Sequence, residues 1–319
     1  MTTKLTSILK AEGLEHLIPT LVDQGIVDSM LADLTESDLK TIGIDKLGER
    51  KRLLTVFAES KSAKPAIWAP SGLMVRVEGG ILPAGSPQAG TMVEPFLIGQ
   101  YAVTNQEWQS VRSWGNANGY EIDLPELGGG ATFAKSYPKH PVVSINWYDC
   151  VKWCNAKSEM EGLEPVYGLE GEEGVFCTGE FVDNRSSVIA WDENANGYRL
   201  PKIAEWEWVA RGGNNSKGYS FAGANNLNEV GWYESNSEGQ VKEVGLKTPN
   251  ELGLFDMSGN VQERCWEIDL GDTDEAITHW VRGGSYLTPE EDCKVSEIIW
   301  TCKPGQSGKD LGFRIARRL

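Results

Sequence analysis

GLFDMSGNVQERCWE, residues 253–267, is the stretch of this sequence on which the interpretation of the rest depends. Asp256 and Glu263 place carboxylates on either side of a glycine-containing turn, and carboxylate and carbonyl oxygens are the ligands that a hard cation takes. Gln262 and Arg264 are polar where apolar side chains are expected. The stretch is therefore either the wall of an enzyme's pocket or the frame of a site that no longer performs chemistry.

The composition sets broad limits on fold and partners. A chain of 319 residues exceeds what one small core organises, so we expect two medium domains or a large domain with a small one. Its 36 glycines and 12 tryptophans are typical of a loop-rich fold held by large aromatic side chains. The net charge of -16 provides no basic surface for a phosphate backbone, so we do not expect nucleic acid as a partner.

The sequence contains no long apolar segment. The first residues lack an apolar signal region, and no run of about 18 apolar residues occurs, so we expect a cytoplasmic protein that does not bind or cross a membrane. Six cysteines without a CxxC pair are expected to be reduced thiols. Cys150 and Cys154 share one helix face, where core packing is favoured over metal binding because no second pair or histidine completes a zinc site.

Residues 5–60 have the apolar spacing of short helices. GLEHLIPTLVDQGIVDSMLADL, residues 13–34, resembles the first half of a SAM (sterile alpha motif) domain. LTESDLKTIGIDKLGERKRLLTVF, residues 34–57, resembles the second half. The resemblance implies a five-helix bundle over residues 1–64, and a linker rich in Pro, Ala and Ser follows at 65–72.

SAM domains mostly bind other SAM domains, so the resemblance implies self-association or recruitment of a partner. Opposite charges gather on two parts of this segment and permit head-to-tail contact. The basic group opens the last expected helix and the acidic group lies in the middle: Lys46, Arg50, Lys51 and Arg52 against Asp28, Asp33, Glu36 and Asp38. Two ordinary solvated faces are the alternative.

From residue 73 onward the sequence alternates short strands with capped helices. We expect helices that begin after Thr104 and Asn146, and a hairpin between residues 167 and 197. Six ordered blocks resemble the formylglycine-generating-enzyme (sulfatase-modifying factor) domain, a variant of the C-type lectin fold. They are FLIGQYAVTNQEW, HPVVSINWYDCVKWCN, GYRLPKIAEWEWVARGG, VGLKTPNELGLFDMSGNVQE, VRGGSY and LGFRIARRL. The expected fold class is α+β: the SAM bundle, then an irregular mixed α/β C-type lectin domain over 73–319.

Catalytic members of that family hold a copper ion with two cysteines that follow the RGGSY block, and they oxidise a cysteine of a client protein. Aligned on this block, the first ligand position falls on Thr288 and the second on Cys293. One thiolate and one hydroxyl do not hold a soft copper ion, so we expect no copper. Cys302 replaces the missing ligand only if a loop rearranges. Three histidines, one of them His16 in the SAM segment, do not make the three-histidine iron site of related sulfoxide synthases.

The resemblance also implies structural calcium, because family members bind it with a mixture of side-chain and carbonyl oxygens. The first implied set takes the side chains of Asp256 and Glu263 with the backbone carbonyls of Gly259 and Val261. The second takes the side chains of Asn228 and Asn236 with the backbone carbonyls of Glu229 and Glu238. At the second set Asn236 stands where family members can have an aspartate, which lowers the charge of the site. The alternative for Asp256 and Glu263 is that they cap backbone amides.

The groove-facing residues differ from the family while the frame is kept. Gln262 and Arg264 replace tryptophans common in the family, and Ser285 matches a pocket serine. The expected ligand face is formed by residues of the C-terminal blocks: Gln262, Arg264, Trp266, Ser285, Tyr286, Thr288, Ile298, Ile299, Trp300 and Gln306. Aromatic, arginine and adaptable polar side chains of this kind are typical of protein-binding surfaces.

The sequence therefore predicts a non-catalytic module joined to a SAM domain. The module is expected to bind a ligand, and the favoured class of ligand is a protein. Some proteins with this domain are the variable proteins of diversity-generating retroelements, in which the C-terminal face is mutated to bind many ligands, and this remains open. The alternatives are an oxidoreductase or other enzyme that uses Cys293, and a scaffold polymerised by its SAM domain.

Overall fold

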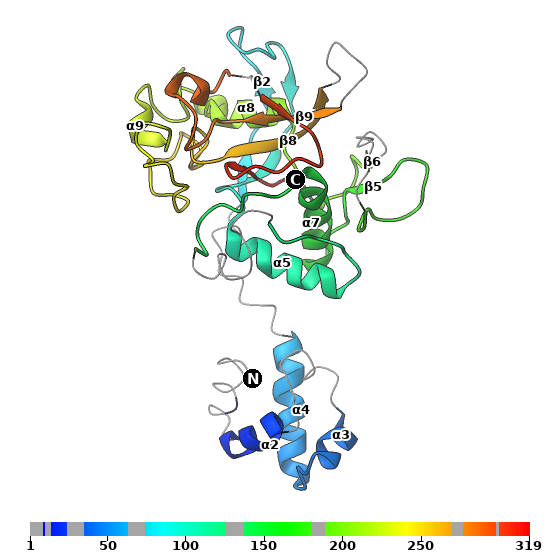
Figure 1. Ribbon diagram of the computed structural model, residues 1–319. Helices are drawn as coiled ribbons and strands as arrows, with labels where there is room; N and C mark the ends of the chain where they lie inside the picture. The colour runs from blue at the N-terminus through cyan, green and yellow to red at the C-terminus, as the bar shows by residue number, and fades with distance from the viewer. Residues whose placement is uncertain are drawn as a thin grey trace. The chain divides into compact units, whose positions relative to one another are not determined.

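The chain forms two compact units, Met1–Trp68 and Ala69–Leu319, which are described separately (Figure 1). The linker predicted at 65–72 lies outside the described residues. In the described part of the chain, no helix combines the length and the apolar character needed to span a bilayer. The structure, a computed structural model, describes residues 9, 14–23, 35–62, 74–125, 137–179, 189–269, 277–297 and 300–319.

The first unit is helical in its described part. Its elements are η1 Glu15–Leu17, α2 Ile18–Asp23, α3 Glu36–Thr41 and α4 Leu47–Ser62. Their apolar side chains share one core, which contains Leu9, Leu14, Leu17, Leu39, Ile44 and Leu53. The last helix begins at Leu47. The predicted count of five helices depends on residues outside the described ones and stays a prediction.

Arg50 corrects the predicted basic face of α4. Its side chain is 7% exposed, and its guanidinium donates to the carbonyls of Ile44 at 2.9 Å and Asp45 at 2.6 Å. These bonds close the loop that leads into α4, because its carbonyls have no helical partner. The basic face therefore reduces to Lys46, Lys51 and Arg52, which are exposed.

The second unit is built around two four-stranded sheets. The antiparallel sheet has the order β1-β4-β12-β7, and the other has the order β10-β9-β8-β11, with β11 parallel to β8. Two residues, 314 and 315, separate β11 from β12, so the end of the chain joins the two sheets. The strands are β1 Met74–Val77, β4 Phe96–Gly99, β7 Tyr198–Arg199, β8 Gln262–Asp269, β9 Thr278–Arg282, β10 Trp300–Cys302, β11 Leu311–Phe313 and β12 Ala316–Arg318.

Helices and short hairpins surround these sheets. Thr104 accepts a bond from the Glu107 amide and Asn146 from the Asp149 amide, so both predicted N-caps are confirmed. The predicted hairpin after residue 167 is also confirmed, since β5 pairs with β6. The elements are α5 Asn105–Ala117, α7 Trp147–Met160, α8 Ile203–Ala210, α9 Leu227–Val230, η4 Gly213–Asn215, η5 Glu290–Cys293, β2 Gly80–Ile81, β3 Met92–Val93, β5 Tyr167–Leu169 and β6 Ile189–Trp191.

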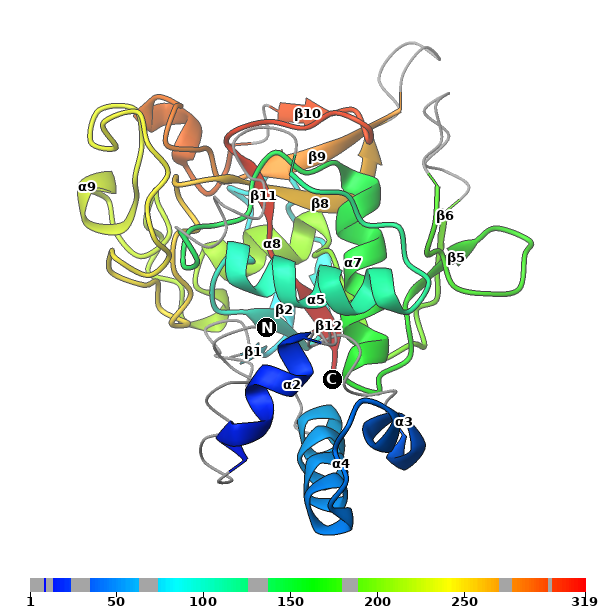
Figure 2. The ribbon, with the colours of Figure 1, turned by 60° about the horizontal axis from the view of Figure 1, so that its bottom comes forward.

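Large aromatic side chains form the core between the helices and the sheets. α5 packs on α7 (Figure 2), where the rings of Trp108 and Trp153 stack with centroids 5.9 Å apart. Phe313 of β11 meets both rings edge-on. Cys150 and Cys154 are fully buried in this cluster, as predicted. The mixed helix and strand architecture of the second unit thus confirms the expected fold class for this part of the chain.

Candidate functional site

The stretch 253–267 contains a sharp turn and then most of β8. Asp256, Gly259 and Asn260 have positive φ angles of 57°, 86° and 63°. A Cβ atom at Gly259 would lie 2.2 Å from the carbonyl oxygen of Trp232, so only glycine fits there. The turn brings the first half of the stretch against the loop that follows α9.

Asp256 has one oxygen that the protein leaves without a partner. Its side chain is buried at 4% exposure, and Oδ2 accepts a bond from the Gly245 amide at 2.8 Å. Oδ1 is also buried and has no hydrogen-bond partner. Burial raises the pKa of this carboxyl to about 6. A buried carboxylate oxygen of this kind suits a cation, since an unpaired buried polar atom is costly.

Glu263 is committed to other side chains. Arg314 donates Nη2 to Oε1 at 2.8 Å and Nε to Oε2 at 3.0 Å, and the Trp206 indole donates to Oε2 at 2.7 Å. All three groups are buried. Glu263 as a calcium ligand stays a prediction, and its carboxylate is already paired with the Arg314 guanidinium. In the described part of the chain, no three His, Cys, Asp or Glu side chains are grouped as a metal site.

Thr288 and Cys293 lie together, as the alignment with the copper site implies. Thr288 Oγ1 is 3.3 Å from Cys293 Sγ, accepts from the Ser285 amide at 2.8 Å and contacts the Ser285 carbonyl at 3.1 Å. Cys293 is fully buried at the end of η5, and burial raises the pKa of its thiol to about 11. A thiol with this pKa is protonated at neutral pH. Cys302 lies elsewhere, on β10 opposite His279.

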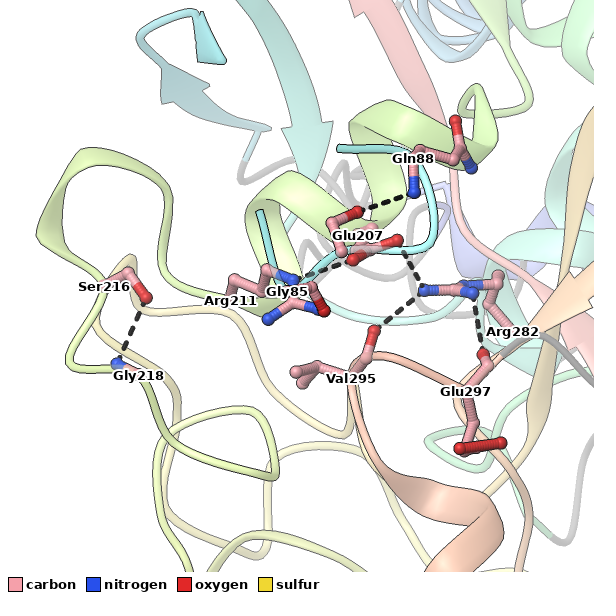
Figure 3. Close-up of polar contacts among 10 residues, drawn as sticks. Gly85, Gln88, Glu207, Arg211, Ser216, Gly218, Arg282, Val295 and Glu297 are labelled. Atoms are coloured by element: carbon pink, nitrogen blue, oxygen red, sulfur yellow. Dashed lines mark hydrogen bonds and ion pairs between the residues drawn. The ribbon is translucent and has the colours of Figure 1, made fainter. Parts of the chain in front are cut away.

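A buried ion pair holds the segment that follows Cys293 (Figure 3). Arg282, the last residue of β9, donates to the carbonyls of Val295 at 2.8 Å and Glu297 at 2.7 Å. Its guanidinium also bonds Glu207 of α8 at 3.3 Å, and both side chains are fully buried. The sequence contains no local signal for this pair, because Arg282 and Glu207 lie 75 residues apart along the chain.

Four of the seven predicted face residues whose side chains the structure describes are buried. Arg264 is fully buried, Ser285 is buried and bonds Asp310 at 2.8 Å, and Tyr286 is 6% exposed. Trp266 packs among aromatic rings, with centroids 5.0 to 5.4 Å from those of Tyr167, Trp191 and Trp147. Thr288 is 7% exposed. Ile298 and Ile299 lie outside the described residues, as does the side chain of Trp300.

Among the predicted face residues that the structure describes, Gln306 is exposed, and Gln262 and Trp266 are half-buried. Gln262 lies at the start of β8, and Gln306 lies in the loop before β11. Arg264 supports this loop from below, because it donates Nη2 to the carbonyls of Ile145 and Gln306. Its Nε and Nη1 have no partner. Arg264 therefore holds the loop in place.

A polar cavity of about 310 Å³ lies beside the same loop and was not anticipated from the sequence. Ser144 lines it, donates its amide to the Gly308 carbonyl at 2.8 Å and has a φ of 61°. Its hydroxyl is buried without a partner. The other described lining residues are Arg112, Asp123, Leu124, Asn146 and Asp149. They come from α5, α7 and the segments next to them, so only the fold brings them together.

The second predicted calcium set lies on α9 and the loop that follows it. Asn228 and Glu229 belong to the helix, whereas Asn236 and Glu238 lie in the loop. The Glu238 side chain is 85% exposed and its φ is 58°.

Comparisons with known proteins agree with this geometry. The model of the "sulfatase-modifying factor enzyme 1-like domain" matches residues 59–319, and the SAM domain model matches residues 4–60. "Chaperone protein LppX" of Paenibacillus barcinonensis is 32% identical over 76% of this chain and 89% of its own. A "formylglycine-generating enzyme" of Thermomonospora curvata is 27% identical over 72% and 84%. The structure of "Treponema denticola variable protein 1" has a TM-score of 0.60 at 32% identity, covering 77% of this chain and 95% of the other.

Proposed function

The chain belongs to the sulfatase-modifying factor enzyme 1-like domain family, with a SAM domain before that domain, and from this premise we propose that it binds a protein ligand without oxidising it. One observation carries the proposal. The two positions that bear copper-binding cysteines in catalytic relatives hold Thr288 and a buried Cys293, 3.3 Å apart. A soft copper ion requires two thiolates, and this pair offers one thiol whose pKa is raised to about 11.

Members of the family use one fold for both binding and catalysis, so the residues of the site distinguish the two functions. The relatives include a protein named as a chaperone, a variable protein and formylglycine-generating enzymes. The same frame with altered surface loops is the usual way in which a binding protein changes its partner. We therefore assign this chain to the binding group.

The proposed binding surface consists of Gln262 and the loop 303–310, in which Gln306 is exposed. The backbone N–H of Gln262 donates to the backbone carbonyl of Asp310 at 2.8 Å, which keeps β8 next to the loop. Arg264 fixes the loop from below and Ser285 bonds Asp310. This arrangement lets the exposed side chains vary while the buried contacts keep the loop in place.

An anaerobic Cu(I) titration and a separate oxygen-uptake assay in air test the proposal. The wild-type chain is expected to bind Cu(I) weakly and to take up no oxygen with a cysteine-containing peptide as substrate. Cys293→Ser and the control Cys302→Ser are expected to behave like the wild type. Tight one-to-one Cu(I) binding that Cys293→Ser abolishes, with oxidation of the peptide, means that the chain is an oxidoreductase.

Diversification of the binding surface is a separate part of the proposal. If the C-terminal tract is diversified, natural copies of this gene from one locus differ mainly within residues 286–310, and the buried Arg282 and Arg314 stay unchanged. Sequencing such copies checks this. Equal variation over the whole domain contradicts it.

The SAM unit is proposed to associate with itself or with a partner through the exposed basic residues Lys46, Lys51 and Arg52. Light scattering on residues 1–64 at millimolar concentration and low salt is expected to show assembly that Lys51→Glu weakens. A fragment that stays monomeric contradicts the proposal.

We also propose one structural calcium ion at the turn of Asp256, Gly259 and Val261. The unpartnered Asp256 Oδ1 supports it, and Glu263 would contribute only by sharing its carboxylate with Arg314. Calcium here braces a loop and performs no reaction. A calorimetric titration is expected to show one calcium ion bound, which Asp256→Ala removes.

A further inference from the structure

The segment of residues 226–248, which contains α9 and the loop after it and is called the 226–248 loop below, uses its own hydrogen-bond donors where the family resemblance implies calcium. Asn228 Oδ1 accepts from Asn236 Nδ2 at 3.2 Å. The Asn236 side-chain oxygen accepts from the Tyr233 amide at 2.8 Å. The Glu229 carbonyl accepts from the Thr248 amide at 3.1 Å. Three of the four implied ligand oxygens are therefore already occupied by N–H groups.

Lys247 places a positive charge beside this set of oxygens, on the backbone carbonyl of Asn228, which is not itself one of the four implied ligands. Its ammonium donates to the Asn228 carbonyl at 2.6 Å. It also lies 4.0 Å from the centroid of the Trp232 ring, a cation–π contact that the ammonium of Lys242 shares from 5.7 Å. The half-buried Lys247 side chain thus ties the end of the loop to α9 and to the indole in its middle.

The donor set does not fit a calcium ion. Calcium in proteins takes six to eight oxygens, and its affinity rises with the number of carboxylates among them. Here the side chains are two neutral amides, and the nearest cationic group bonds the backbone of Asn228 itself. A calcium ion bound to Asn228 Oδ1 would displace the Asn236 amide that donates to this oxygen. The positively charged ammonium of Lys247 would also repel the ion.

We propose that Lys247 takes the structural role of the second calcium ion, so that the 226–248 loop is closed by an ammonium of the chain and holds without calcium. The Lys247 ammonium supplies the positive charge and contacts the Asn228 carbonyl and the Trp232 ring. The Asn236 side chain joins the two halves of the loop, because it donates to the Asn228 side chain and to the Gly231 carbonyl. This inference is independent of the calcium proposed at Asp256.

Calorimetric calcium titration of the full, decalcified chain separates the two sites. Asn228→Ala is expected to leave the number of calcium ions bound by the wild type unchanged, whether that number is one or zero. A calcium ion that binds the wild type and is lost in Asn228→Ala overturns the inference. Loss of an ion only in Asp256→Ala concerns the other site.

Thermal unfolding tests the role of the ammonium itself. Lys247→Met keeps most of the apolar stem but removes the charge, and we expect its melting temperature to fall by about 2–4 °C, equally with calcium and with chelator. Lys242→Met is the matched control, since Lys242 is farther from the same ring and its ion pair with Glu238 is long, at 3.6 Å. Equal melting temperatures for Lys247→Met and Lys242→Met overturn the inference.

A double variant asks whether Lys247 stands in the place of the ion. Asn236→Asp removes the amide donor and adds a carboxylate, and Lys247→Met removes the competing charge. Together they are expected to add one calcium ion to the titration, whereas Asn236→Asp alone forms an ion pair with Lys247 and adds none. A double variant that gains no calcium shows that the ammonium and the ion do not share a place.

Discussion

Glu267, the last residue of the stretch 253–267, is expected to destabilise the protein when it ionises. Its carboxylate accepts a bond from the Ile203 amide at 2.7 Å, at the start of α8. Burial raises the pKa of this carboxyl from an ordinary 4.5 to about 7. Glu267→Gln keeps an oxygen for Ile203 and carries no charge, so we expect it to stabilise the protein at pH 8.

The size and sign of the effect follow from the pKa. Because the folded-state pKa lies above the unfolded value, the stability linked to protonated Glu267 is fully present below pH 4.5 and is lost as the pH rises through 7. The difference between about 7 and 4.5 corresponds to at most about 3 kcal/mol. For a domain of this size, that is a rise in melting temperature of at most about 10 °C for Glu267→Gln at pH 8.

Thermal and urea unfolding of wild type and Glu267→Gln at pH 5, 6, 7 and 8 measure this difference. Other titrating groups cancel because the two proteins are compared at each pH. Glu193→Gln is the control, since the Glu193 side chain is 78% exposed, and it is expected to show no dependence on pH. A difference for Glu267→Gln that stays constant from pH 5 to 8 refutes the argument, as does a loss of stability at pH 8.

Three further predictions concern the region around Cys293. Thr288→Cys supplies the missing thiol 3.3 Å from Cys293 Sγ and is expected to bind Cu(I) one to one in competition with a chromogenic chelator; affinity equal to that of the wild type contradicts this. Cys293 in the folded wild type is expected to resist iodoacetamide at pH 7.5, because fewer than about one thiol in a thousand is ionised, and mass spectrometry of the peptide checks it. Arg282→Ala is expected to cost about 3 kcal/mol in urea unfolding, since the Glu207 charge stays buried; a cost below about 1 kcal/mol argues against the pair.

Local signals in the sequence were sufficient for elements whose causes are local. Thr104 and Asn146 cap their helices because each bonds an amide three residues further on, a distance that any reader of the sequence can see. The order of the strands has no such signal. β12 lies between β4 and β7, and β11 runs parallel to β8, because the end of the chain returns to segments more than 40 residues earlier.

The burial of Arg264 could not be derived from its position in the sequence. A charged residue in place of an apolar one normally indicates an exposed surface. Here the carbonyls of Ile145 and Gln306, from opposite sides along the chain, approach its guanidinium and cover it. Arg264 is therefore buried where an exposed side chain was expected, and its part in ligand binding stays a prediction.

The charged side chains of the stretch 253–267 all point to a structural role. Asp256, Glu263 and Arg264 are buried, and Glu267 bonds the start of α8. Asp256 holds the turn at Gly245, and Glu263 holds the guanidinium of Arg314 between the sheets. Arg264 holds the loop before β11, and Glu267 holds the start of α8. Residues that hold a loop in place constrain its backbone but leave its outward side chains free. Specificity is therefore expected to reside in Gln262 and the loops after β9, and changes there can alter the partner while the frame of the domain stays intact.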